Sequence, residues 1–300
     1  MDAKKRLAQM IETAMQAAFP DAQELPDAGQ IEAFIEVPPE REMGDFGTKL
    51  YTASLQPLEN EALFQYYYRL LPRERRRKTD RMRNPVVRRE SLGAGVLLCL
   101  ALADFGICSG PEGPADGRSL RLKEAKDGKP YLEDYPELHF NLSHSAGRVL
   151  CILSEAECGC DAEKIHLKNA DSLLRCLSSA EADWIREVSG QERILRFTRL
   201  WTLKESYVKA VGKGLQIPLN SFEVRMKPEK DSACGHPSDP SLLPVQGGDA
   251  FRLRELSAPE GYCFSCCWKT GDPGFSAKEL DLTSGGEIRG KRADILPEIQ

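Results

Sequence analysis

The sequence predicts an α+β fold, and three observations support that prediction. Segments with helical spacing of apolar residues and segments with strand-like alternation both occur, without the regular strand–helix–strand order of a doubly wound sheet. The composition is typical of a globular protein, with 41% hydrophobic and 29% charged residues. At 300 residues, the chain is long enough for two compact units with additional segments.

The first fifty residues predict one helix and one strand. Apolar residues recur at helical spacing over residues 4–19 and stop at Pro20, and residues 31–37 alternate in the manner of a strand. The segment contains ten acidic and five basic residues, so it accounts for the chain's entire net charge of −5. Because one helix and one strand are too little for an independent core, we expect residues 1–50 to form an N-terminal extension.

Beyond residue 50, the periodicities predict two units and a tail. In the first unit, residues 51–156, we expect strands over 51–55, 120–124, 139–143 and 149–154, and helices over 60–71, 72–82 and 85–102. In the second unit, residues 157–270, we expect helices over 170–177, 179–188 and 191–211, and strands over 158–163, 219–226, 251–256 and 262–269. Residues 271–300 lack strong periodicity and predict a loose C-terminal tail.

Composition and charge argue against several classes of protein. A net charge of −5 gives no general attraction to nucleic acid. The longest apolar run, residues 96–103, is too short to cross a bilayer, and no apolar core of a secretory signal follows the basic residues 4–6. The ten cysteines have no framework spacing, so we expect free thiols in a reducing, cytoplasmic setting, including Cys263, Cys266 and Cys267 on a strand.

Local charge is concentrated in one block. Nine basic residues lie between Arg73 and Arg89, against only Glu74 and Asp80. Such a block could hold phosphate groups, or it could be the solvated face of a helix, which is the more common outcome for a run of charge. The block alone does not choose between these interpretations.

Two carboxylates are spaced for a metal ion in the segment Gly-Cys-Asp-Ala-Glu at residues 159–163. On a strand, Asp161 and Glu163 share a face because side chains alternate. Neighbouring carboxylates repel unless a cation lies between them, and an all-oxygen site suits Mg²⁺. Taken alone, however, an Asp-x-Glu pattern is more often two solvated carboxylates at a strand end.

A third carboxylate occurs in the segment Trp-Thr-Leu-Lys-Glu-Ser-Tyr-Val-Lys at residues 201–209. On a helix, Trp201, Glu205 and Lys209 lie on one face, so Glu205 could complete a metal site and Lys209 could supply a point charge for phosphate. The alternative is an ordinary surface ion pair beside a core tryptophan. Gly212, which follows, fits the end of a helix.

Further polar residues occur in Gly-Lys-Pro at 128–130 and Phe-Asn-Leu-Ser-His-Ser at 140–145. Ser143 and His144 lie where a strand gives way to a turn, and they could donate hydrogen bonds to phosphate oxygens. A serine beside a histidine also suggests a hydrolase. Adjacent side chains rarely face each other, however, and the chain has no Gly-x-Ser-x-Gly elbow.

The order and spacing of these four segments, which end in Trp-Thr-Leu-Lys-Glu-Ser-Tyr-Val-Lys-Ala, resemble the phosphopantetheinyl transferase family. The similarity covers about residues 51–270 and is to the broad-specificity, two-lobed type that activates peptide and polyketide synthases. It implies two similar α+β lobes, a pseudo-dimer, with coenzyme A in the cleft between them. Such an enzyme transfers 4′-phosphopantetheine from coenzyme A to a serine of an apo acyl or peptidyl carrier protein and releases adenosine 3′,5′-bisphosphate.

The resemblance also implies a role for each matching residue. The ligands to Mg²⁺ would be Asp161, Glu163 and Glu205. The contacts to coenzyme A would be Arg77, Arg89, Lys129, Pro130, Ser143, His144 and Lys209. The catalytic groups would be Glu205 as first candidate for the general base, Lys209 and His144. Two positions depart from the family's pattern: Glu74 stands where a basic residue is usual, and Cys160 where an aliphatic residue is usual.

The first fifty residues fall outside this resemblance. Residues 35–48 look like part of the N-terminal domain of arginyl-tRNA synthetase, but the His-x-Gly-His motif of that class is absent, so we expect no synthetase activity. The competing hypothesis for the whole chain is a non-catalytic protein that binds coenzyme A, or tRNA through residues 1–50. For the enzyme we expect a monomer with a carrier protein as partner, without a membrane or nucleic acid.

Overall fold

The computed structural model of this chain describes residues 47–105, 107, 116–166, 173–226, 242–243, 245–246, 251–269, 274–283 and 290–292. The helix and the strand predicted before residue 46 lie outside these residues.

Two β-sheets organise the described residues. The larger sheet has the strand order β13-β12-β1-β5-β4, and the smaller has the order β6-β11-β10-β8. The larger sheet consists of β13 (Gly290–Arg292), β12 (Phe275–Leu280), β1 (Thr48–Ser54), β5 (Arg148–Ser154) and β4 (His139–Ser145). The smaller consists of β6 (Cys158–Lys164), β11 (Tyr262–Lys269), β10 (Phe251–Leu256) and β8 (Leu242–Leu243). Two further ladders pair β2 (Leu122–Glu124) with β3 (Pro130–Leu132), and β7 (Glu223–Val224) with β9 (Val245–Gln246).

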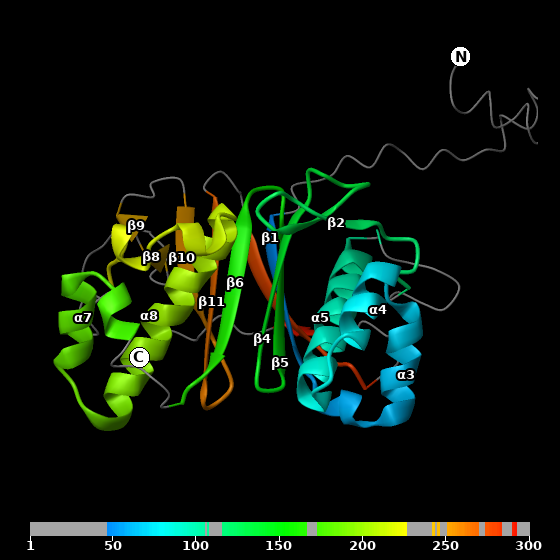
Figure 1. The fold of residues 1–300 in the computed structure, drawn as a ribbon, viewed down its shortest axis with the longest axis horizontal. Helices are drawn as coiled ribbons and strands as arrows, with labels where there is room; N and C mark the ends of the chain where they lie inside the picture. Colours follow the sequence, from blue (N-terminus) through cyan, green and yellow to red (C-terminus); the bar gives the residue numbers. More distant parts are fainter. Residues whose placement is uncertain are drawn as a thin grey trace, which may run out of the picture. The chain divides into compact units, whose positions relative to one another are not determined.

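Each sheet is accompanied by its own helices (Figure 1). The larger sheet packs against α5 (Pro85–Asp104), with α3 (Glu61–Leu70) and α4 (Arg73–Asp80) beside it; the smaller packs against α8 (Gly190–Val211), with α7 (Ser179–Arg186) beside it. Short 3₁₀ turns occur at Gln56–Glu59, Leu174–Cys176, Gly214–Gln216 and Leu219–Ser221. The structure confirms the predicted mixture of helices and sheets.

Strand β5 shows how the layers are joined. Val149, Cys151 and Leu153 pack into the core under α5, whereas Leu150 and Ile152 pack against the smaller sheet. All five are buried, and successive strand residues point to opposite faces, so β5 is covered on both sides. A third core lies between α8 and the smaller sheet. The resulting order is helices, larger sheet, smaller sheet, helices.

Local sequence accounts for the limits of the two long helices. Asn84 caps α5 by accepting a hydrogen bond from the Val86 amide at 2.9 Å, and Pro85 occupies the first turn, where no amide hydrogen is needed. Helix α8 ends at Gly212, which has a φ of 81°, as its sequence predicts. Helix α5 contains the most apolar run, yet no helix in the described part of the chain is both long and apolar enough to cross a membrane.

Two secondary-structure predictions need correction. The strand predicted over 219–226 is a 3₁₀ turn at Leu219–Ser221 followed by the two-residue strand β7, because Pro218 and the turn's own hydrogen bonds interrupt the alternation. The helix predicted over 170–177 is a 3₁₀ turn at Leu174–Cys176 in its described portion. The predicted strand over 262–269 is β11, and its three cysteines are free thiols, as expected.

The predicted loose tail is wrong over Phe275–Leu280. These residues form β12, which pairs in parallel with β1 from Thr48↔Phe275 to Ala53↔Leu280. The amide of Thr48 also donates to the carbonyl of Gly274 at 2.7 Å. The periodicity of this segment is weak because its order comes from the backbone of a strand more than two hundred residues earlier.

Candidate active site

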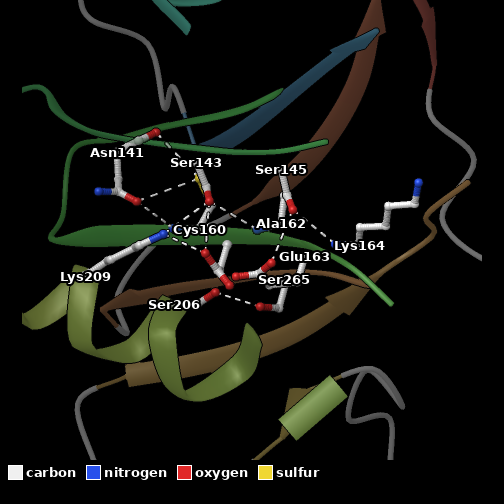
Figure 2. Close-up of polar contacts among 11 residues, drawn as sticks. Asn141, Ser143, Ser145, Cys160, Ala162, Glu163, Lys164, Ser206, Lys209 and Ser265 are labelled. Atoms are coloured by element: carbon white, nitrogen blue, oxygen red, sulfur yellow. Dashed lines mark hydrogen bonds and ion pairs between the residues drawn. The ribbon is translucent and has the colours of Figure 1, made fainter. Parts of the chain in front are cut away.

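Three elements place the predicted site residues together: β6 supplies Asp161, and β4 and α8 supply Ser143 and Lys209, which are labelled in Figure 2. The ammonium of Lys209 lies 2.6 Å from Asp161 Oδ1 and donates to Ser143 Oγ at 3.1 Å. Ser143 Oγ donates to the same carboxylate oxygen at 2.9 Å. We call Asp161, Ser143 and Lys209 the central cluster.

A glycine allows α8 to lie close enough for these contacts. A Cβ atom at Gly159 would come within 2.3 Å of the carbonyl oxygen of Ser206 and within 2.4 Å of the amide nitrogen of Ala210. Both atoms belong to the backbone of α8, so a side chain there could be accommodated only by moving the helix. Because Asp161 follows two residues later on β6, this close approach brings the carboxylate within reach of Lys209.

The other two predicted metal ligands are electrostatically coupled to Asp161. Burial, together with the charge of Asp161, raises the pKa of Glu163 on β6 and the pKa of Glu205 on α8. Asp161 Oδ2 is buried and has no hydrogen-bond partner in the described part of the chain. A carboxylate oxygen left without a partner in a buried place is costly unless a ligand meets it.

The chemistry of these donors suits a cation, although their spacing does not form a metal site among the described residues. Within the described residues, no group of three His, Cys, Asp or Glu side chains is arranged closely enough to hold a metal ion. The donors are nevertheless the all-oxygen set that Mg²⁺ prefers, and the unpartnered Asp161 Oδ2 leaves one ligand position open.

His144 belongs to a second group of charges next to the central cluster. Its Nδ1 lies 3.3 Å from Glu90 Oε2 on α5. Burial lowers the pKa of His144, and the positive charges of Lys209, Arg75 and Lys78 lower it further, against the opposite effect of Glu90. The positive charges of Arg75 and Lys78 on α4 therefore act on His144 together with that of Lys209, and this positive potential favours an anionic ligand.

Arg75 is not among the site residues predicted from the sequence, which include its neighbour Arg77. The guanidinium of Arg75 donates to the carbonyl of Ser91 at 2.8 Å, and burial lowers its pKa. Its Nε is a buried donor without a partner in the described part of the chain. The local signal that could have identified it is weak, because its side chain is directed inward only by the packing of α4 against α5.

Ser143 and Lys129 have unexpected partners. The Ser143 hydroxyl donates to Asp161 and accepts from both Lys209 and the Ala162 amide, which uses all of the bonds a hydroxyl can form. The Lys129 ammonium donates to three backbone carbonyls, those of Cys158, Lys209 and Ala210, at 2.9–3.2 Å. A contact with phosphate stays a prediction for both residues. To form it, each side chain would have to give up at least one of these hydrogen bonds.

The remaining predicted residues lie farther from the central cluster. Pro130 begins β3. Arg77 is exposed on α4, and Arg89 lies half-buried on α5, 3.7 Å from Glu59. Among the described residues, neither arginine forms a hydrogen bond or ion pair with the central cluster.

Two members of the central cluster, Asp161 and Lys209, lie in a region that matches a family of known proteins. Residues 157–267 match the family model described as ACPS, the 4′-phosphopantetheinyl transferase superfamily. A 4′-phosphopantetheinyl transferase of Bacillus subtilis is 35% identical over 140 residues, which are 47% of this chain and 59% of that protein. The transferase psf-1 of Bacillus pumilus is 27% identical over 201 residues, 66% of this chain and 83% of that protein.

A human relative extends the comparison beyond bacteria. The L-aminoadipate-semialdehyde dehydrogenase-phosphopantetheinyl transferase of Homo sapiens is 31% identical over 123 residues, 36% of this chain and 40% of that protein. The chain thus spans only 59% of the Bacillus subtilis relative and less of the human one. Together, these matches support a relationship between this chain and the phosphopantetheinyl transferase superfamily.

Proposed function

We propose that this protein transfers 4′-phosphopantetheine from coenzyme A to a serine of an apo acyl or peptidyl carrier protein. The observation that carries the proposal is the central cluster, in which the Lys209 ammonium lies 2.6 Å from Asp161 Oδ1 while Asp161 Oδ2 remains buried without a partner in the described residues. Asp161 and Lys209 both fall within the region that matches the superfamily. Coenzyme A, the carrier protein and the release of adenosine 3′,5′-bisphosphate all belong to this proposal.

Magnesium is part of the proposal. Asp161, Glu163 and Glu205 would hold the ion, which would supply positive charge to the pyrophosphate of coenzyme A. The coupling of Glu163 and Glu205 to Asp161 supports this assignment, because three mutually repelling carboxylates are stabilised by a divalent cation.

The protein's own residues would do three things in this reaction. Lys209 would neutralise charge that develops on the leaving phosphate, and His144 would hold the phosphates in place. Glu205 is the first candidate to take the proton of the carrier serine.

The arrangement of the two halves also enters here as a proposal. Each half has one long helix on one sheet, α5 in residues 51–156 and α8 in residues 157–270, which supports two similar lobes forming a pseudo-dimer. We further propose a cytoplasmic monomer. The similarity of residues 1–50 to arginyl-tRNA synthetase stays a prediction, and with it the alternative of a non-catalytic protein that binds coenzyme A or tRNA.

Transfer of labelled pantetheine tests the proposal. The full chain, coenzyme A labelled in the pantetheine arm, Mg²⁺ and an apo carrier protein are incubated, and label on the carrier is measured. We expect labelling that depends on Mg²⁺ and that is lost when the carrier serine is changed to alanine. Tight binding of coenzyme A without labelling of either an acyl or a peptidyl carrier would favour the non-catalytic alternative.

A further inference from the structure

Among the described residues, the two sheets meet at strands that each lack a neighbouring strand on one side. Strand β4 is the last strand of the larger sheet, and β6 is the first strand of the smaller one. An edge strand leaves a row of backbone amides and carbonyls without partners from its own sheet. These backbone groups need other partners when the edge strand is buried. Most residues of β6 are buried, so this requirement applies to β6.

Side chains of β4 meet the free amides of β6 (Figure 2). Asn141 Oδ1 accepts from the Cys160 amide at 3.0 Å, and Ser143 Oγ accepts from the Ala162 amide at 3.2 Å. Ser145 Oγ accepts from the Lys164 amide at 3.1 Å. The contact advances two residues at a time along both strands, which is the spacing at which strand side chains point to one face.

Two of these β4 side chains also donate a hydrogen bond to a carboxylate of β6. The Ser143 hydroxyl donates to Asp161 Oδ1 at 2.9 Å, and the Ser145 hydroxyl donates to Glu163 Oε2 at 3.2 Å. Each serine therefore bonds both the carboxylate of one β6 residue and the amide of the next. A hydroxyl can do this because it is both a donor and an acceptor.

We propose that Asn141, Ser143 and Ser145 form a side-chain ladder that joins β4 to β6, and that Ser143 and Ser145 are positioning residues for the carboxylates of Asp161 and Glu163. The second half of this proposal rests on the proposed function, because it treats the two carboxylates as metal ligands. Residues that orient metal ligands from outside the coordination sphere commonly change metal affinity by about 10- to 100-fold when they are replaced.

Ser145 gives the sharpest test because it is half-buried at the end of β4, where its replacement should leave the fold intact. Ser145→Thr keeps the hydroxyl. Ser145→Val introduces a side chain of nearly the same shape as threonine but without the hydroxyl. Ser276→Val is the control, since Ser276 is an exposed serine of β12. The first measurement is amide hydrogen exchange at Lys164, with the amides of Cys160 and Ala162 as internal references.

We expect exchange at the Lys164 amide to be roughly tenfold faster in Ser145→Val, as for the loss of one hydrogen bond, and near the normal rate in Ser145→Thr. The Cys160 amide should be unaffected by either change. Equal exchange at Lys164 in the valine and threonine variants would overturn the ladder.

The second measurement is the affinity for Mg²⁺ alone by calorimetry, together with the Mg²⁺ concentration that half-activates transfer. In Ser145→Val, we expect the affinity for Mg²⁺ to fall and the half-activating Mg²⁺ concentration to rise, each by about tenfold or more. In Ser145→Thr, both should be close to their normal values. Faster exchange with an unchanged Mg²⁺ requirement would overturn the positioning role. If even the unmodified protein fails to label a carrier, the proposed function is wrong, while the exchange pattern still decides the ladder.

Discussion

Two lysines on α8, five residues apart, form ion pairs of different character. The Lys204 ammonium is fully buried and lies 2.5 Å from Glu181 Oε1 and 2.8 Å from the carbonyl of Phe222. Both oxygens of Glu181 have further partners, the Val224 amide at 2.9 Å and the Ser178 amide at 3.0 Å. In this pair, every carboxylate oxygen is satisfied within the protein.

The pair of Lys209 and Asp161 is left incomplete. The Lys209 side chain is 27% exposed, and Asp161 Oδ2 has no partner in the described residues. The pKa shifts differ too: burial lowers the pKa of Lys204, whereas at Lys209 the effect of burial is outweighed by Asp161 and the pKa is raised. The comparison indicates that the Lys204 pair serves the fold, and it supports the proposal that the Lys209 pair serves a ligand.

The largest expected effect is on transfer, from changes to the incomplete pair. Asp161→Ala and Glu205→Ala should each lower the transfer rate at least about a thousandfold, roughly 4 kcal/mol in the barrier, because each removes a proposed ligand to Mg²⁺. Denaturant unfolding should show little loss of stability. Asp161→Asn, which keeps an acceptor for Lys209 and Ser143, should be as inactive as the alanine variant.

The exposed Asp183 provides a matched control, since Asp183→Asn removes a carboxylate in a surface ion pair. Near-normal turnover of either site variant with Mg²⁺ present would show that the metal assignment is wrong.

The complete pair should respond in the opposite way. Lys204→Met leaves the buried carboxylate of Glu181 without its cation, so we expect a loss of about 3–5 kcal/mol in the free energy of unfolding. Urea titration measures it. Adding Glu181→Gln removes the uncompensated charge and keeps an acceptor for the Val224 amide, so the double variant should regain part of the loss. A Lys204→Met protein of unchanged stability would break the contrast between the two pairs.

Lys209→Ala should have a smaller effect than loss of a metal ligand. We expect a decrease of roughly a hundredfold in kcat, about 2.7 kcal/mol, with a moderate weakening of coenzyme A binding, because the ammonium acts where charge grows in the transition state. Steady-state kinetics with varied coenzyme A separates the two effects. The exposed Lys213, four residues further along, is the control. Equal kinetics of both variants would identify the Lys209 pair as an ordinary surface pair.

Removal of the first residues should have the smallest effect. Every partner named for the two pairs lies between Ser143 and Val224, so a chain that starts at Gly47 should keep both. The cut must spare Thr48, whose hydroxyl lies 3.0 Å from that of Ser154 in the core. Rates of the full and shortened chains are compared on one apo carrier. A folded shortened chain with more than about a hundredfold loss, roughly 2.7 kcal/mol, would make the leading segment part of the enzyme.

The sequence by itself determined the mixed fold and the helices α3, α4, α5, α7 and α8, because helical spacing and end signals are local properties. It also placed Asp161 and Glu163 on one strand and Glu205 and Lys209 on one helix face. The resemblance of four short segments added the proposed reaction.

Only the tertiary structure decided which of these residues meet. Lys209 and Ser143 are 66 positions apart, and their contact depends on the crossing of α8 over Gly159. The same reason explains what the sequence did not predict: β12 is ordered by the distant β1, and the bonds that occupy Lys129 and Ser143 come from other elements. Periodicity describes which face a side chain shares, whereas hydrogen bonding between elements depends on how those faces are packed together.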